Sequence, residues 1–355
     1  MPPPRDGGYT RQAPPRGPDG PPAHPASQAP RDGRVTRMPE FRRPSLNLRF
    51  LRGRWKAILI VLLVAVVGFG VYLDANLTRV DALADTENSS DGTNYLIVGS
   101  DSRDGLSAED EERLATGDAA GQRTDTIMLL HSGSSGDVLV SIPRDSYVPI
   151  PGKGSNKINA AYAFGGPQLL VETVQNATGL KIDHYVEVGF GGFVGAVDAV
   201  GGVNMCIPEA IKDPKAGLDV QAGCQDLDGQ TALGYVRTRA TPGSDFDRVK
   251  RQREFLSALL QKATSPLTLI NPFRMVPLAN SLTGTITVDS GDHIWNLAGL
   301  AFAMKGVSGG DGVQTTVPVA GAGAGSTLRW DKTRAAGLWG ALAKDEAPSK
   351  SDFGP

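Results

Sequence analysis

The sequence predicts a body of the mixed α/β (α+β) class that is preceded by one transmembrane helix, and three observations predict it. Short runs of apolar and β-branched residues early in the body are typical of strands. Apolar residues at helical spacing farther along are typical of helices that pack on a core. A separate apolar segment near the N-terminus carries no charge and approaches the length of a bilayer-spanning helix.

The N-terminal part predicts a membrane anchor. Residues 1–54 are rich in Pro, Gly, Arg and Gln, and such a composition is typical of a disordered, basic tail. Residues 57–73 are an uncharged apolar run of 17 residues, at the lower limit for a spanning helix. With Trp55 and Tyr72 at the positions of interfacial aromatics, we expect the membrane segment to occupy residues 55–74.

Charge predicts the orientation of that anchor and the kind of ligand. The chain up to Lys56 has 12 Arg or Lys and 4 Asp or Glu, so the positive-inside rule places the N-terminus in the cytoplasm. The body then lies outside the cell membrane of a single-pass protein; an uncleaved signal anchor is preferred because no convincing cleavage site follows. From Ala57 on, the net charge is -10, since the whole chain carries -2. A negative body argues against nucleic-acid binding and suits a local cationic site for one anionic ligand.

The rest of the chain is expected to divide into three parts. Residues 75–92 are polar and are predicted to form a stalk, residues 93–344 the body, and residues 345–355 a short polar tail. Within the body the patterns predict further elements after the first strands. These are helices over 168–176, 190–200, 272–281, 292–304 and 331–342, and strands over 184–188 and 313–319.

The first three strands of the body are expected over 95–98, 127–130 and 138–142. The Gly/Ser-rich turn between the second and third predicts an antiparallel meander. In a meander the end of the first strand, the start of the second and the end of the third meet at one edge of the sheet. Acidic and Arg side chains would gather there, namely Asp101, Arg103, Arg123, Asp125, Arg144 and Asp145.

An Arg-rich segment lies farther along the chain. Residues 235–239 alternate like a short strand, so Arg237 and Arg239 would point to one face. Two guanidinium groups bind oxyanions bidentately, which favours a phosphate or pyrophosphate over a single carboxylate. The alternative is a strand edge that Arg residues merely keep soluble.

A helix is expected to follow, with Asp245 or Asp247 as its cap. Arg248 and Gln252 are one turn apart on this helix and share a face. Cys206 and Cys224 are both in the part predicted to be outside, where a disulfide between them would persist; two buried thiols are the alternative.

Taken together, these segments resemble the LytR-CpsA-Psr family over roughly residues 93–343. No single motif is decisive, but their order is specific. The matching stretches are Val98–Arg103, Arg123–Thr126, Ser141–Asp145, Lys157–Ala160, Gly201–Val203, Leu227–Gly229 and the Arg-rich segment with its helix.

The resemblance implies a central mixed, partly antiparallel sheet flanked by helices, and an extracytoplasmic phosphotransferase. Such enzymes move a glycan with one phosphate from a polyprenyl pyrophosphate onto a muramic acid hydroxyl of peptidoglycan, as when teichoic acid is attached to the cell wall. The partners implied are the polyprenyl pyrophosphate-linked glycan, peptidoglycan and the lipid bilayer. Two alternatives remain open: a polyprenyl pyrophosphate pyrophosphatase, and a non-catalytic, membrane-anchored envelope binding or regulatory protein.

The resemblance also implies roles for individual residues. Asp101 and Asp125 are similar to the acids that hold Mg²⁺, for which Mn²⁺ is the alternative. The residues that would bind pyrophosphate are Arg123, Arg144, Lys157, Arg237, Arg239, Arg248 and Gln252, joined by Arg103 at the same predicted edge. Three acids, Asp145, Asp245 and Asp247, are candidates for the general base, beside Arg144 in the catalytic set. Asp247 stands where the family commonly has Gly, and Arg253 where a second Gln is common.

Overall fold

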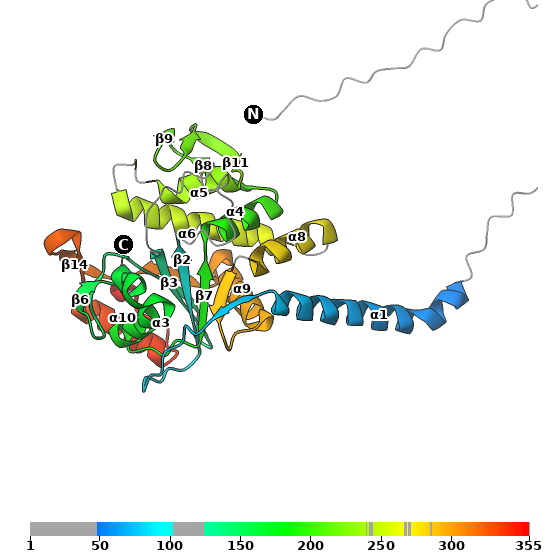
Figure 1. The fold of residues 1–355 in the computed structure, drawn as a ribbon, viewed down its shortest axis with the longest axis horizontal. Helices are drawn as coiled ribbons and strands as arrows, with labels where there is room; N and C mark the ends of the chain where they lie inside the picture. The colour runs from blue at the N-terminus through cyan, green and yellow to red at the C-terminus, as the bar shows by residue number, and fades with distance from the viewer. Residues whose placement is uncertain are drawn as a thin grey trace, which may run out of the picture. The chain divides into compact units, whose positions relative to one another are not determined.

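A computed structural model describes residues 48–101, 124–238, 240, 244–265, 268, 271–284 and 286–354 (Figure 1). The chain divides into two units, Met1–Lys56 and Ala57–Pro355, and the second contains the folded body. Helix α1 (Leu48–Ala75) includes the predicted membrane segment. Its part Trp55–Ala75 is 21 residues long and is apolar enough to cross a membrane by length and composition.

The body is built on a mixed sheet of seven strands in the order β1-β12-β7-β2-β3-β4-β13. The predicted meander is confirmed, because β3 pairs antiparallel with both β2 and β4. Strand β7 runs parallel to β2, and β13 runs parallel to β4, which makes the sheet mixed. The strands are β1 (Thr78–Val80), β2 (Thr93–Ser100), β3 (Thr124–Gly133), β4 (Gly136–Ile142), β7 (His184–Val188), β12 (Ile286–Asp289) and β13 (Val313–Thr316).

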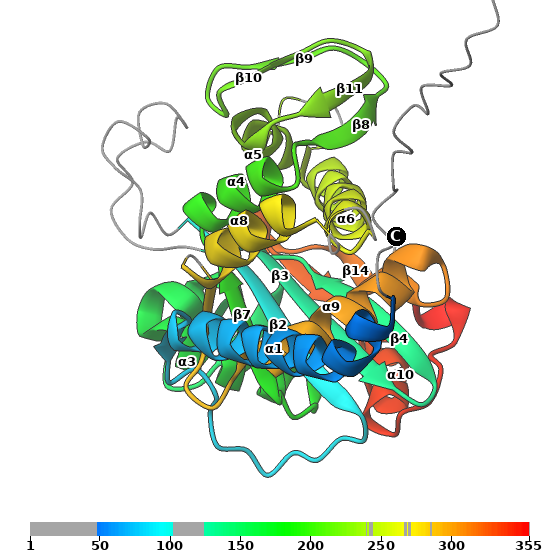
Figure 2. The same ribbon diagram turned by 90° about the vertical axis from the view of Figure 1, so that its right-hand side faces the viewer.

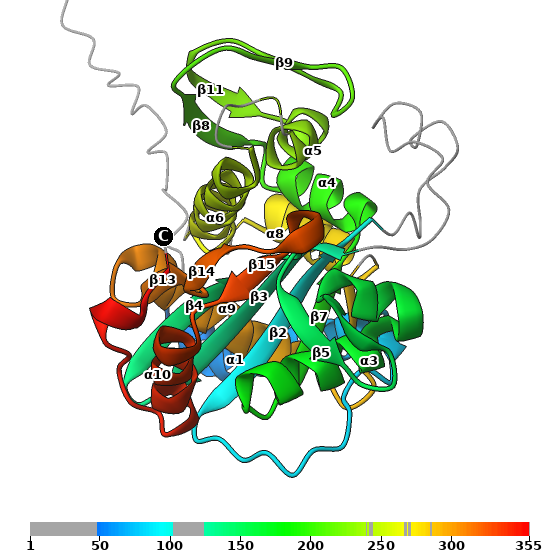
Figure 3. The ribbon, with the colours of Figure 1, turned by 90° about the vertical axis from the view of Figure 1, so that its left-hand side faces the viewer.

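Helices cover both faces of this sheet because its central strands are apolar on both sides. On one face Val98, Leu129 and Val140 pack against α3 (Asn159–Thr178) and α10 (Lys332–Ala343), which Figure 3 shows. On the other face Met128, Leu130 and Leu139 pack against α9 (Ile294–Gly309) and α6 (Ser244–Ala263) (Figure 2). Alternate residues of β3 therefore contribute to opposite cores.

A second core lies beside the sheet (Figure 2). We expected the helix over 190–200 to pack on the sheet. Helix α4 (Phe190–Ala199) instead packs in this second core, where it contacts α5 (Gly229–Arg237) and α8 (Pro272–Thr283). Two hairpins extend this core, β8 (Val203–Ile207) with β11 (Gly223–Leu227) and β9 (Ile211–Asp213) with β10 (Leu218–Val220). A disulfide joins Cys206 to Cys224 across the first hairpin.

The remaining short elements complete the body. They are β5 (Tyr147–Ile150), β6 (Gly154–Lys157), β14 (Val319–Ala322), β15 (Leu328–Trp330) and the 3₁₀ turns η1 (Ala324–Ser326) and η2 (Lys350–Asp352). Helix α3 is interrupted at Gly165 and Gly166, where Gly166 has a φ of 66°. The second part of the helix begins at Pro167, as the sequence predicts.

The segments predicted as a stalk and a polar tail both contact the folded body. In residues 75–92, β1 joins the edge of the sheet, and the amides of Ala82 and Leu83 donate to the carboxylate of Asp289. After Lys344, the amide of Gly354 donates to the carbonyl oxygen of Thr316 over 2.8 Å. Three-residue edge strands and single hydrogen bonds to distant residues leave no periodic pattern in a polar sequence.

Candidate functional site

The edge predicted from the meander exists in the fold. Ser100 at the end of β2 pairs with Thr124 at the start of β3, and Ile127 of β3 pairs with Ile142 at the end of β4. The loops that follow β2 and β4 therefore leave the sheet at the same end of its strands, and this end is the edge meant here. Of the six predicted residues, Asp101, Arg144 and Asp145 belong to the described part of the chain. Arg103 and Arg123 lie outside it, and Asp125 lies in β3 but its side chain is not described.

A compact group of charges follows β4. The Lys157 ammonium lies 2.6 Å from one carboxylate oxygen of Asp145, and Nε of Arg144 lies 3.5 Å from the other. Lys157 reaches this position because the β5–β6 hairpin pairs it with Tyr147, directly after the loop. The three side chains are only partly exposed, at 14% to 31%. With two cations and one acid, this group of three side chains carries a net positive charge.

Backbone hydrogen bonds hold this group in place. The amide of Asn159, at the start of α3, donates to the carbonyl oxygen of Arg144 over 3.2 Å. The amide of Leu328 donates to the carbonyl oxygen of Asp145 over 2.8 Å. The loop is thus fixed from both sides, by α3 and by β15, which limits the freedom of Arg144 and Asp145.

Residues 235–237 of the Arg-rich segment are the end of helix α5, which corrects the strand predicted to begin at Tyr235. Asp228 caps α5 by accepting a hydrogen bond from the amide of Thr231, and the helix continues to Arg237. Tyr235 and Val236 are both buried, so successive residues face the same core and strand alternation does not apply. Five residues at the end of a helix are too few to distinguish the two periods.

Arg237 is consequently the last residue of α5, and its guanidinium lies 4.8 Å from the centre of the Phe190 ring. A guanidinium above an aromatic face is held by a cation–π interaction. Arg239 lies outside the described residues, so the shared face predicted for Arg237 and Arg239 no longer rests on a strand.

Helix α6 also begins earlier than predicted. It starts at Ser244, so Asp245 and Asp247 belong to its first turn and neither caps it. Acidic residues in a first turn interact favourably with the helix dipole. The side chains of Asp245, Asp247 and Arg248 are not described, whereas Gln252 is, and its amide donates to the carbonyl oxygen of Val236 over 3.2 Å.

One buried residue of the site was not predicted from the sequence. Arg251 has a relative exposure of only 7%. Its guanidinium donates to the carbonyl oxygen of Thr238 over 2.7 Å. Arg251 and Gln252 together connect α6 to the end of α5, at the carbonyl oxygens of Thr238 and Val236. In the sequence Arg251 is one of several neighbouring charges, and nothing there distinguishes the buried one.

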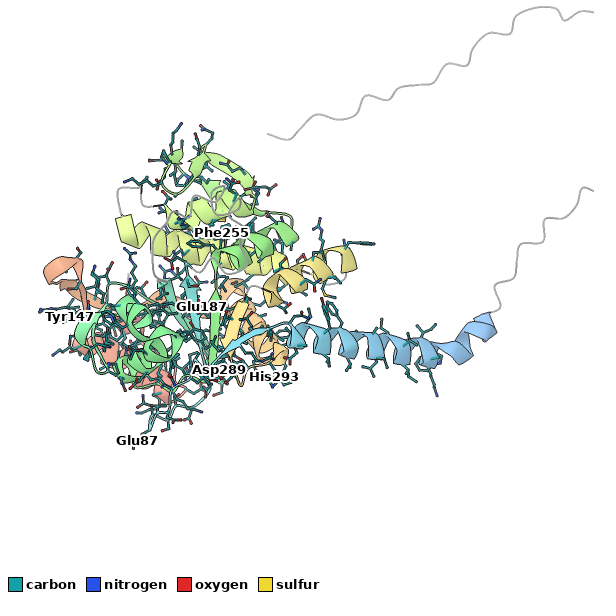
Figure 4. The ribbon with its side chains drawn as sticks, in the orientation of Figure 1. Glu87, Tyr147, Glu187, Phe255, Asp289 and His293 are labelled. Atoms are coloured by element: carbon teal, nitrogen blue, oxygen red, sulfur yellow. A yellow bond between two sulfur atoms is a disulfide. The ribbon has the colours of Figure 1, made fainter. Side chains whose placement is uncertain are left out.

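A buried carboxylate was missed as well. Glu187 on β7 pairs with Val98 of β2, one residue before the end of β7, and Figure 4 labels it in the interior. Its two oxygens accept hydrogen bonds from the hydroxyls of Tyr162 and Tyr185, both at 2.7 Å. Burial, followed by the adjacent Glu187, raises the pKa of Tyr185, which therefore stays a donor. The sequence could have indicated this buried carboxylate, because Glu187 stands among apolar residues in the strand predicted over 184–188.

The two Asp residues proposed to hold a metal each adjoin the last pair between β2 and β3, Ser100 with Thr124. Asp101 follows β2 and Asp125 is the second residue of the neighbouring β3. A pair of carboxylates offers only oxygen ligands, and Mg²⁺ in phosphate sites commonly takes one or two of these. These all-oxygen donors are of the kind that Mg²⁺ takes. Among the residues that the structure describes, no group of three or more His, Cys, Asp or Glu could hold a metal.

A family model described as the LytR_cpsA_psr family matches residues 73–344. This chain belongs to the LytR_cpsA_psr family. The match begins before the predicted body and includes the segment that was expected to be a stalk, in agreement with the position of β1 in the sheet.

Two relatives of this LytR_cpsA_psr protein have names that refer to the cell wall or to peptidoglycan. It is 53% identical to the probable cell wall biosynthesis protein LcpB of Corynebacterium glutamicum, over 84% of this chain and 72% of that protein. It is 35% identical to the polyisoprenyl-teichoic acid–peptidoglycan teichoic acid transferase TagU of Oceanobacillus iheyensis, over 59% of this chain and 68% of that protein.

Among solved structures, the LytR-Csp2A-Psr enzyme from Actinomyces oris has the same fold. The TM-score is 0.61 at 24% identity, and the match covers 76% of this chain and 96% of that one. The mixed sheet flanked by helices is therefore the LytR_cpsA_psr fold, as the resemblance implies.

Proposed function

We propose that this chain is an extracytoplasmic phosphotransferase that attaches a glycan phosphate from a polyprenyl pyrophosphate carrier to peptidoglycan, at the C6 hydroxyl of muramic acid. Family membership supports a transferase of cell-wall glycopolymers, because relatives carry the names of cell wall biosynthesis protein and teichoic acid transferase. The observation that carries the finer proposal is the cationic group at the sheet edge, where Arg144 and Lys157 flank Asp145.

The charges of this group suit a pyrophosphate. Arg144 and Lys157 lie at the edge to which Asp101 and Asp125 also belong, so cations and acids of the site are close in the fold. Phosphoryl transfer requires in-line positioning and neutralisation of charge more than covalent chemistry by the protein. A divalent cation bound by the two acids would supply part of that neutralisation.

We assign pyrophosphate binding to the cations of the two parts of the site. One set belongs to the edge of the sheet and the other to the ends of α5 and α6. These residues are Arg103, Arg123, Arg144, Lys157, Arg237, Arg239 and Arg248, with Gln252 fixing the end of α5. Through its hydrogen bond to Val236, Gln252 also positions the end of α5, which carries Arg237.

The general base is assigned to the first turn of α6. Asp145 faces both Lys157 and Arg144, so its two carboxylate oxygens already have cationic partners. Asp245 and Asp247 lie in the helix that follows the Arg-rich segment, and so are near Arg237 of α5 in the chain. Either acid there would accept the proton of the attacking hydroxyl.

The membrane anchor decides on which side of the membrane the reaction would occur. Helix α1 supplies a segment of membrane-spanning length, and the net charge of +8 up to Lys56 favours a cytoplasmic N-terminus. The body would then meet a lipid-linked donor and peptidoglycan on the outer side. Protease added to intact protoplasts should digest the body and spare the tail, and protection of the body would contradict this orientation.

Turnover of the full-length protein in lipid nanodiscs tests the reaction. The donor is a polyprenyl pyrophosphate-linked glycan, and each assay is run with Mg²⁺, with Mn²⁺ or with a chelator, and with or without peptidoglycan fragments. We expect transfer that requires a divalent cation and the acceptor. Cation-dependent release of phosphate that ignores the acceptor would make the protein a pyrophosphatase, and binding without any turnover would make it a regulatory protein.

A further inference from the structure

Two helices of the body expose large apolar side chains that no described residue covers. Phe273 on α8 is 88% exposed, and Trp295 and Phe302 on α9 are 62% and 77% exposed. Figures 1 and 2 place α8 and α9 on the same side of the molecule. We name the set Phe273, Val276, Trp295, Ala298 and Phe302 the α8–α9 apolar surface. Contiguous exposed apolar surfaces usually mark an interaction site, whereas isolated apolar side chains do not.

Helical spacing shows that the exposed side of α9 is a continuous stripe. Its exposed positions Trp295, Ala298, Phe302 and Lys305 follow one another by three or four residues. The opposite side holds the buried Ala303, Met304 and Val307, which pack on the sheet. The inner side of α9 therefore makes the contacts with the core, and the outward-facing Trp295 and Phe302 do not contribute to them.

The charges of the two helices identify the kind of partner. Neither α8 nor α9 contains an Asp or Glu, although the chain from Ala57 on is strongly acidic. Their charged residues are Arg274, Lys305 and no others, and both are exposed. Apolar and cationic side chains without acids match the interface of an anionic bilayer and oppose a cationic protein partner.

The position of this surface relative to the anchor identifies the partner as the membrane. Asp74, one residue before the end of the apolar segment, accepts a hydrogen bond from the amide of Ile294 over 2.8 Å. It also lies 3.1 Å from Nδ1 of His293, whose ring stacks on Trp295 at 4.2 Å. The first turn of α9 is thus fixed to the end of the span, where interfacial Trp residues are enriched.

We propose that the α8–α9 apolar surface rests on the outer leaflet of the membrane, with Trp295, Phe302 and Phe273 inserted among anionic lipids. This inference rests on the membrane-spanning role proposed for α1. Docking through a second site besides α1 would fix the rotation of the body above the bilayer. The site would then keep one orientation toward a lipid-linked donor.

Fluorescent labels on the full-length protein test this proposal. Both native cysteines are in the disulfide, so single cysteines introduced as Phe273→Cys, Trp295→Cys or Phe302→Cys take up a thiol-reactive, environment-sensitive dye alone. Tyr147→Cys is the matched control, since Tyr147 is an aromatic residue, 44% exposed, on the far side from His293 (Figure 4). Val64→Cys, within the span, is the positive control.

The proteins are reconstituted in vesicles of phosphatidylcholine with phosphatidylglycerol, with or without nitroxide-bearing lipids. We expect blue-shifted emission and loss of intensity to the nitroxide for labels at 273, 295 and 302, weaker in phosphatidylcholine alone, and neither effect at 147. Emission at the three sites equal to that at 147, while 64 is quenched, would overturn the proposal. So would shifts that depend on the protein-to-lipid ratio, because a second copy would then cover the surface.

Absence of quenching at 64 would overturn both the docking and the anchor. The transfer reaction is judged separately, by turnover of donor in detergent solution. All labelled variants should keep the thermal transition of the parent, since the substituted side chains are exposed.

Discussion

The guanidinium of Arg251 donates to the carbonyl oxygen of Thr238 over 2.7 Å, within the folded interior. Thr238 is the residue between Arg237 and Arg239, and its own hydroxyl donates to the carboxylate of Asp213 over 2.7 Å. One buried Arg therefore fixes the backbone that carries two proposed pyrophosphate ligands. The first prediction concerns this contact.

Replacing Arg251 by Leu should destabilise the protein and reduce turnover together. The carbonyl oxygen of Thr238 would lose its buried donor, which costs about 1–3 kcal/mol. Lys250→Leu is the matched control, because Lys250 is an exposed neighbour with a 3.8 Å ion pair to Glu254. Urea unfolding and donor turnover are the measurements. Equal unfolding midpoints for the two variants would remove the positioning role of Arg251.

Arg237→Ala and Arg239→Ala should lower turnover with little loss of stability. A lost electrostatic contact to the transition state costs about 3 kcal/mol, or roughly a hundredfold in rate. The thermal transition of Arg237→Ala should fall only slightly, because the partly exposed Arg237 loses a contact with the Phe190 ring worth about 0.5–1 kcal/mol. Arg237→Lys should restore little, since an ammonium lacks the planar fork. Parental turnover in both folded Ala variants would show that these residues are surface charges.

Asp145 and the acids of α6 should differ in the size of their effects. Asp145→Asn removes ion pairs to Lys157 and Arg144, worth about 1 kcal/mol or roughly fivefold in kcat/KM. Loss of the general base removes about 10²–10⁴-fold, so one of Asp245→Asn and Asp247→Asn should fall by this amount. The pH dependence of kcat distinguishes them, because only the base variant loses its acidic limb. A larger loss at Asp145 than at either other acid would reverse the assignment.

Asp345 should stabilise the protein above pH 4 and lose this effect in acid. Hydrogen bonds from Ser134 Oγ, and then from the amides of Ser134 and Ser135, hold the pKa of Asp345 well below its usual 3.8. The deprotonated form is thus favoured by folding, so its contribution is complete above the unfolded pKa and disappears as the pH falls toward the folded one.

Asp345→Asn should therefore lower the free energy of unfolding at neutral pH by about 1–3 kcal/mol, and the difference should shrink below pH 4. Asn is a suitable replacement because residue 345 has a φ of 53°, which Asn tolerates. Chemical denaturation across pH is the measurement. A difference independent of pH would show that the carboxylate charge is not its source.

Much of the architecture follows from local patterns. The meander of β2, β3 and β4 was predictable because each strand is an apolar run and the turn from Gly133 to Gly136 is short. That connectivity alone brings Asp101, Arg144 and Asp145 to one edge. The relation of β7 and β13 to the sheet was not predictable from pattern, because parallel partners are chosen by crossovers through distant residues.

Some features of the candidate site likewise follow from the sequence, and others only from the fold. The sequence by itself determined which residues are charged, their order along the chain, and the apolar helix before the body, since composition and period are local properties. Only the tertiary structure decided that Tyr235–Arg237 is the end of a helix, that Arg251 and Glu187 are buried, and that Lys157 faces Asp145. Burial and pairing depend on what residues far away in the chain place around a side chain, and that arrangement exists only once the chain has folded.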